Sequence, residues 1–183
     1  MTFTIHTVRR PLARRTSLAG LTPLGPDQFE GYASLFDVAD GGGDTVAPGA
    51  FAASLRRRGP GQVRMLYQHF SHAPIGVWEK IAEDGRGLYV RGRLSSDVEQ
   101  ARDIAALLRD GALNGLSIGF RTVRAKRGPQ GRRILQEVEL WEISVVTFPL
   151  LAGSTVTAIG ARQGDDLARL FRQASRALLS EGA

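Results

Sequence analysis

Apolar and polar residues alternate along several short segments of this chain, a pattern typical of strands that bury one face. Residues 2–8 (TFTIHTV) and 28–36 (QFEGYASLF) alternate in this way and contain β-branched or aromatic side chains. The same pattern predicts further strands at 63–70, 74–83, 87–94, 116–125, 133–148 and 155–159. Short turns separate the three strands between 63 and 94, which indicates a meander, and the sequence RGPQG at 127–131 indicates a hairpin.

Helical periodicity is found in three places. A helix is predicted over 48–58, where Pro48 suits the first turn. A longer helix begins at Ser96, which forms a capping box with Glu99 and precedes an apolar stripe. A third, amphipathic helix is predicted within the tail at 163–181.

Together these elements predict a mainly β fold with flanking helices (α+β), in the form of a closed or highly curved β-barrel of about seven strands surrounded by helices. Residues 9–27 predict a flexible loop, and the glycine run in 37–48 indicates a flexible turn without regular structure. The length of 183 residues is consistent with one domain over 1–160 and a helical tail over 161–183.

The chain lacks the sequence features of a membrane or secreted protein. No uninterrupted apolar run approaches the roughly 20 residues that a membrane helix needs, and the N-terminus has no apolar signal segment. We therefore expect a cytoplasmic protein with no membrane partner. The absence of cysteine excludes disulfides, thiolate metal sites and a cysteine nucleophile. A covalent catalyst would have to use an oxygen or an amine.

The formal net charge is +6, and 22 of the 24 basic residues are arginine. A basic excess can indicate nucleic-acid binding. These arginines, however, are scattered in twos and threes without the aromatic residues between them that single-strand binding uses. Nucleic acid is therefore not the expected partner.

Residues 115–119 (GLSIG) match the G-x-S-x-G pattern of the nucleophile elbow, with Ser117 as the serine. The context excludes an α/β-hydrolase, because a predicted helix precedes the serine and a strand follows it. Those enzymes also need a histidine after the serine, and the last histidine here is His72. Any triad must therefore place histidine before serine. The glycines would let the backbone N–H groups of Ile118 and Gly119 serve as an oxyanion hole, although a simple turn would also explain them.

A serine nucleophile needs a base, and only His6, His69 and His72 can supply an imidazole. His69 ends an apolar strand, where the sheet can fix its side chain, and His72 lies in the next turn. The spacing of His69 and His72 also suggests a metal pair, but no third ligand lies near them in the sequence. We expect no metal and no cofactor. A purely structural role for these histidines remains open from the residues alone.

Several segments together resemble the prohead protease family of tailed bacteriophages and gene-transfer particles. They occur in the order GYASLFDVAD, DTVAPGAFAASL, LYQHFSHAPIGVWE, GLYVRGRL, ARDIAALLRDGALNG, LSIGF and LWEISVVTFPLLAGSTVTAI, between about residues 30 and 159. The resemblance implies a serine endopeptidase similar to the herpesvirus assemblins, a β-barrel ringed by helices. His69 falls in the matching histidine motif and Ser117 in the matching serine motif.

The third catalytic residue is less directly indicated. Assemblins have a second histidine after the serine, which this chain lacks. The resemblance implies a carboxylate in LWEISVV, and Glu142 is the candidate because a carboxylate can orient the imidazole. Glu139 and Glu137 are reserves, although Glu139 should point to the opposite face of the strand.

The same resemblance implies the biological setting. The expected substrates and partners are the major capsid protein, the scaffold and the protease itself, with self-association, inside the assembling prohead of a phage or gene-transfer particle in a bacterial cytoplasm. Autoproteolysis is predicted within about 150–166 or in the loop at 9–27, where an exposed connector can enter an active-site cleft. The alternative is a catalytically silent module of the same fold that binds capsid or scaffold.

Overall fold

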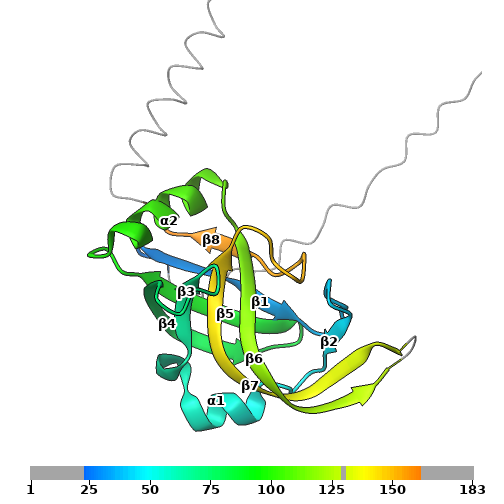
Figure 1. Cartoon of the computed structure of the whole chain (residues 1–183). Coiled ribbons are helices and arrows are strands. Elements are labelled where there is room, and N and C mark those ends of the chain that lie inside the picture. Colours follow the sequence, from blue (N-terminus) through cyan, green and yellow to red (C-terminus); the bar gives the residue numbers. More distant parts are fainter. Residues whose placement is uncertain (1–22, 129–130, 162–183) are drawn as a thin grey trace, which may run out of the picture.

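The computed structural model of the chain describes residues 23–128 and 131–161, and in this part the chain forms one strongly curled sheet with helices at its two ends (Figure 1). The elements in chain order are β1 (Gln28–Leu35), β2 (Asp44–Val46), α1 (Ala52–Arg58), the 3-10 helix η1 (Pro60–Gln62), β3 (Arg64–Tyr67), β4 (Pro74–Glu83), β5 (Gly87–Leu94), α2 (Glu99–Asp110), β6 (Gly115–Arg127), β7 (Arg133–Val146) and β8 (Val156–Ile159).

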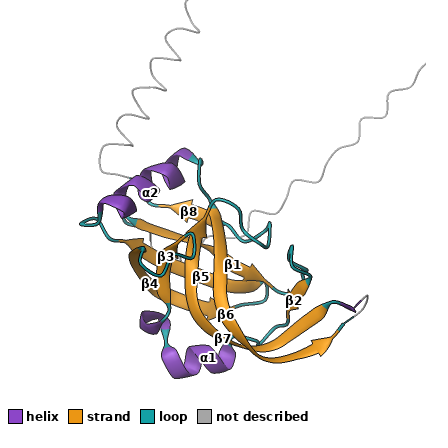
Figure 2. Ribbon diagram, in the orientation of Figure 1, coloured by secondary structure: helices purple, strands orange, loops and turns teal. Residues whose placement is uncertain are grey.

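Seven of the strands follow one another around the curl in the order β6-β7-β3-β4-β5-β1-β8, and β2 pairs with β7 beside β3. The two ends of this series meet at an isolated bridge between Gly115 and Thr155. There the Leu116 N–H donates to the Ser154 carbonyl at 2.9 Å, and the Val156 N–H donates to the Asn114 carbonyl at 2.8 Å. The predicted closed or highly curved barrel of about seven strands, with flanking helices, is therefore confirmed (Figure 2).

The long strand β7 organises this sheet. One edge pairs with β6 along the whole hairpin, and the other edge pairs in parallel with β2 at 133–135 and with β3 at 142–145. Because β3 and β7 run in the same direction, the loops that follow them leave the barrel at the same rim. Segments 73 residues apart in the sequence are thereby brought side by side.

Apolar side chains on the inner face of the curled sheet form one core. Phe29 packs edge to face on Trp78, with ring centroids 5.5 Å apart. Burying an aromatic or large aliphatic side chain of this kind contributes about 1.5–3 kcal/mol. The packing leaves no space at Gly92, where a Cβ would lie 2.4 Å from Met65 Cε. The largest fully buried side chains are Phe29, Phe51, Met65, Ile75, Leu88, Leu94, Ile104, Leu116, Leu135, Leu140, Ile143 and Val90.

The two α-helices cover opposite ends of the barrel (Figures 1 and 2). Helix α2 buries Ala101, Ile104, Ala105 and Leu108, which recur at helical spacing, and it ends at Gly111, whose φ of 73° is in the left-handed region. Among the described residues, no helix is long and apolar enough to cross a membrane.

Several predicted boundaries differ from the structure. The helix expected over 48–58 begins only at Ala52, because 48–51 form a turn, and the helix expected from Ser96 begins at Glu99 without a side-chain cap. The expectation of a turn without regular structure across 37–48 was wrong in part. Residues Asp44–Val46 form β2, since the chain after the glycines extends alongside β7. The predicted strand at 2–8, the helix at 163–181 and most of the loop at 9–27 lie outside the described residues.

Candidate active site

His69 lies in a turn at the end of β3, and the turn is unusual. The strand predicted over 63–70 ends at Tyr67, because Gln68 and His69 have φ angles of 52° and 61°. Residues other than glycine adopt such angles at a cost of about 1–3 kcal/mol each, so the surrounding contacts must hold them there. The Gln68 N–H donates to the Val145 carbonyl at 3.0 Å, and the Gln68 side chain bonds to Thr147 Oγ1 at 2.7 Å.

This turn places the His69 ring against the outer face of β7, where it contacts Glu142. The distance between His69 Nδ1 and Glu142 Oε1 is 2.7 Å. The imidazole side chain is 45% exposed and the carboxylate side chain only 13% exposed. The pair therefore joins a shielded carboxylate to a ring that solvent or a substrate can reach.

Gly119 lies directly opposite Glu142 in the β6–β7 pairing. A Cβ at Gly119 would lie 2.0 Å from Glu142 Oε1 and 2.7 Å from its carboxyl carbon. Only glycine therefore allows the Glu142 side chain to lie across β6 in this conformation. The glycine that the sequence offered as an oxyanion-hole residue has this second, steric reason to be there.

Ser144 is the neighbour that sequence reasoning did not select. It lies two residues after Glu142 on the same face of β7 and is fully buried. Its hydroxyl donates to Glu142 Oε2 at 2.6 Å and accepts the His69 backbone N–H at 3.1 Å. The spacing Glu-x-Ser within an alternating strand was the available signal, because it puts both side chains on one face.

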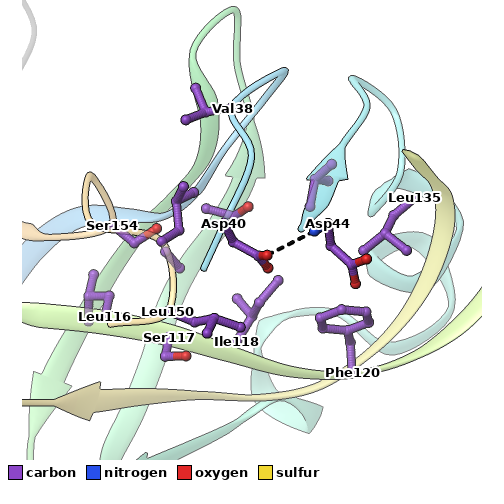
Figure 3. A pocket seen from close by; sticks show the side chains of 14 residues that line it. Val38, Asp40, Asp44, Leu116, Ser117, Ile118, Phe120, Leu135, Leu150 and Ser154 are labelled. Carbon is purple, nitrogen blue, oxygen red and sulfur yellow. Dashed lines mark hydrogen bonds between the residues drawn. The ribbon is translucent and has the colours of Figure 1, made fainter. Parts of the chain in front are cut away.

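Ser117 lies on β6 directly opposite Ser144. Leu116 on one side of it is fully buried and Ile118 on the other packs against the core, so Ser117 points to the outer face that carries Glu142 and Ser144. Figure 3 shows the Ser117 side chain on the opposite side of β6 from Ile118. Ser117 is partly exposed, and its hydroxyl has no hydrogen-bond partner among the described residues.

A recess adjoins Ser117 along β6. Apolar side chains from three parts of the chain line it, among them Val38, Ile118 and Leu150, and Asp40 and Asp44 lie at its polar end (Figure 3). Its free space for water-sized spheres is about 40 Å³. This is room for a few waters at most.

None of the other acidic and imidazole candidates among the described residues is hydrogen-bonded to His69 or Glu142. Glu139 is buried beneath α1, where hydrogen bonds from Arg58 and Arg57 lower the pKa of its carboxyl. His72 stacks on Phe70, with ring centroids 5.5 Å apart. Glu137 is paired in register with Arg124 on the outer part of the hairpin. His6 lies outside the described residues.

Comparison with known proteins gives consistent results. Residues 21–169 match a family model described as Caudovirus prohead serine protease. The prohead protease of Enterobacteria phage HK97 is 37% identical over 147 residues, which cover 77% of this chain and 64% of that protein. The prohead protease of Escherichia phage T5 is 29% identical over 103 residues, 56% of this chain and 48% of that protein. The chain thus spans less than two thirds of the length of these relatives.

The fold also has a counterpart among solved structures. The bacteriophage T4 capsid assembly protease superposes with a TM-score of 0.55 at 16% identity, over 65% of this chain and 80% of that one. The varicella-zoster virus protease gives a TM-score of 0.44 at 15% identity, over 70% and 62%.

Proposed function

Because the chain belongs to the prohead serine protease family of caudoviruses, we propose that it is a serine endopeptidase that cleaves capsid and scaffold proteins during head maturation. The observation that carries the proposal is the 2.7 Å hydrogen bond between His69 and Glu142, formed on the face of the sheet to which Ser117 points. In this proposal Ser117 is the nucleophile, His69 the general base and Glu142 the residue that orients the base.

The chemistry follows from the two ring nitrogens of His69. Since Nδ1 bonds to the Glu142 carboxylate, the neutral ring carries its proton on Nδ1 and leaves Nε2 free to accept the Ser117 proton. The serine oxygen attacks the scissile carbonyl, and Nε2 then returns the proton to the leaving amine. Water hydrolyses the acyl-enzyme by the same route, and the carboxylate stabilises the imidazolium in both steps.

An oxyanion hole can be assigned in part from strand geometry. The Leu116 N–H points away from β7, since it donates to Ser154. Backbone groups alternate along a strand, so we expect the Ile118 N–H to point the same way and the Gly119 N–H to point toward β7. The proposal therefore uses the Ile118 N–H as the oxyanion donor and gives Gly119 the role of making room for Glu142.

The expected substrates follow from the family. The HK97 and T5 relatives are named as prohead proteases, which supports capsid and scaffold substrates inside an assembling prohead, with self-association of the protease. Autoproteolysis within 150–166 or 9–27 is part of the proposal. Residues 156–159 form β8, the strand next to the closing bridge, so cleavage that leaves the barrel whole must avoid them.

The second candidate is a catalytically silent module that binds capsid or scaffold through the same fold. The two differ at Ser117, because only an activated serine reacts quickly with a fluorophosphonate. We expect the purified chain to gain the mass of one phosphonyl group on Ser117, and the Ser117→Ala and His69→Ala variants to gain none. A folded wild-type chain that stays unlabelled would support the silent module.

A further inference from the structure

We propose that Ser144 is a positioning residue that holds both the Glu142 carboxylate and the backbone of His69, the proposed catalytic base. This inference rests on the proposed function, since it concerns how the His69–Glu142 pair keeps its geometry. Ser144 occupies the centre of the site, opposite Ser117 on β6 and opposite Leu66 on β3. Its hydroxyl therefore lies between the strand of the nucleophile and the strand that leads to the base.

The first contact fixes the carboxylate. One Glu142 oxygen bonds to the His69 ring, and the other accepts the Ser144 hydroxyl at 2.6 Å. A glutamate side chain with one bond can rotate about that bond, whereas a carboxylate held through both oxygens cannot turn without breaking one of them. Hydrogen bonds to a charged acceptor are stronger than neutral ones, which makes this restraint effective.

The second contact fixes the backbone of the base. The Ser144 oxygen accepts the His69 N–H at 3.1 Å, in the turn where both Gln68 and His69 have positive φ. The neighbouring Gln68 N–H is held by the Val145 carbonyl. Two successive residues of β7 thus hold two successive residues of this turn, and Ser144 is the one that bonds to the backbone of His69.

The three residues form a closed ring of hydrogen bonds: His69 ring to Glu142, Glu142 to Ser144, and Ser144 to the His69 backbone. The ring explains why a hydroxyl is fully buried on the outer face of β7, the face opposite the core residues Ile143 and Val145. The ring also shows that Ser144 and Ser117 have different roles. The Ser144 proton is engaged and the side chain is fully buried, so Ser144 cannot be the nucleophile.

Ser144→Ala and Ser54→Ala make a matched pair for testing this role. Ser54 in α1 is also fully buried and accepts the Leu140 N–H at 2.9 Å, but it has no hydrogen bond to His69, Ser117 or Glu142. Both changes delete one buried hydroxyl. Nitrogen NMR of the histidine rings reports which nitrogen carries the proton, and with three histidines in the chain the His69 signals can be assigned from a His69→Gln variant.

We expect the wild type and Ser54→Ala to hold the neutral His69 ring with its proton on Nδ1. Ser144→Ala should lose that preference, and its rate of reaction with a fluorophosphonate should fall about 10–100-fold, as for other residues that orient a catalytic side chain. Binding of a substrate peptide, measured on Ser117→Ala and on the Ser117→Ala/Ser144→Ala double variant, should be equal.

A second pair of variants controls for unfolding caused by a substitution at position 144. Ser144→Thr and Ser144→Val add the same volume, but only threonine keeps the hydroxyl, so threonine should retain the Nδ1 proton and valine should not. Equal behaviour of the two variants, or slowing by Ser54→Ala as large as by Ser144→Ala, would overturn the role. If the ring responds as expected while no variant, wild type included, reacts with the fluorophosphonate, the positioning role stands and the proposed protease activity fails.

Discussion

At the scale of single residues, the site depends on small residues of β6 that leave room for the long Glu142 side chain of β7. Gly119 and Ser117 on β6 leave space over which Glu142 reaches toward the His69 ring. The sequence singled out five of the site residues, but it offered Gly119 as a backbone donor only. The steric role could not be read from the sequence, because it depends on the register between β6 and β7.

Gly119→Ala tests that steric role. The new Cβ would lie 2.0 Å from Glu142 Oε1 and must displace the carboxylate. We expect proteolysis to fall at least tenfold, in line with the loss of a group that orients the base, while the circular dichroism spectrum stays that of the wild type. Gly85→Ala is the control, because nothing lies within 4 Å of a Cβ there. A fully active Gly119→Ala variant would contradict the assigned position of Glu142.

Loss of the base should cost more activity than loss of the residue that orients it. Glu142→Gln keeps the shape of the side chain but removes its charge, so the imidazolium is less stabilised while proton transfer can still occur. We therefore expect turnover in the order wild type, Glu142→Gln, His69→Ala, measured on one peptide substrate. His72→Ala should retain most activity, since His72 stacks on Phe70 away from Glu142. A His72→Ala variant as damaged as His69→Ala would reassign the base.

At the scale of elements, the alternating pattern predicted most strands, because strands with one buried face show their period directly in the sequence. The meander of β3, β4 and β5 and the β6–β7 hairpin agree with prediction. The pattern did not predict β2 or the parallel pairing of β3 with β7, since neither depends on local periodicity. The parallel pairing of β3 with β7 brings His69 to Glu142. The contact between these two residues could therefore be predicted only from the family resemblance.

The docking of α1 on β7 gives a prediction about acid stability. Arg58 and Arg57 hold the Glu139 carboxylate and lower its pKa from the ordinary value. A carboxyl with a lowered folded pKa stabilises the fold above its unfolded pKa, about 4.3, and loses this contribution as the pH falls through the folded value. Glu139→Gln should therefore unfold at lower urea concentration than wild type at pH 7.

Urea unfolding at a series of pH values tests whether the ion pairs of Glu139 cause this difference in stability. The difference between the two urea midpoints should shrink as the pH is lowered below about 4.3, because the wild-type carboxyl then becomes neutral as well. Glu99→Gln is the control, since Glu99 is exposed in the first turn of α2 and has no ion pair among the described residues. A Glu139→Gln deficit that is the same at every pH would show that the ion pairs do not stabilise the docking.

At the scale of the whole molecule, the barrel closes through few contacts. The bridge between Gly115 and Thr155 joins the start of β6, just before Ser117, to the residue that precedes β8. A closed or highly curved barrel with flanking helices followed from the sequence, whereas the residues that join its two ends did not, because they depend on how far the sheet curls. The strand that carries Ser117 is thus held by β7 along its length and by the segment before β8 only at its beginning.

This architecture limits where self-cleavage can occur. Cuts at 9–22 or at 162–166 would leave every described strand in place, whereas a cut within 156–159 would remove β8 from the closure. We expect intact-mass measurement after prolonged incubation to show shortened wild-type chains that retain residues 28–159. Ser117→Ala chains should keep their full mass. Identical full-length masses for both would count against self-processing without bearing on other substrates.

The central claim is that Ser117 and His69 cleave capsid protein. The most direct measurement is co-expression of the chain with the major capsid protein of its own particle, followed by intact-mass analysis of the assembled shells. With the wild type, the account predicts a capsid protein shortened at one defined position, and with Ser117→Ala, His69→Ala or both together a capsid protein of full length. Capsid protein of the same full length with the wild type and with the variants, in shells that contain the folded chain, would contradict it.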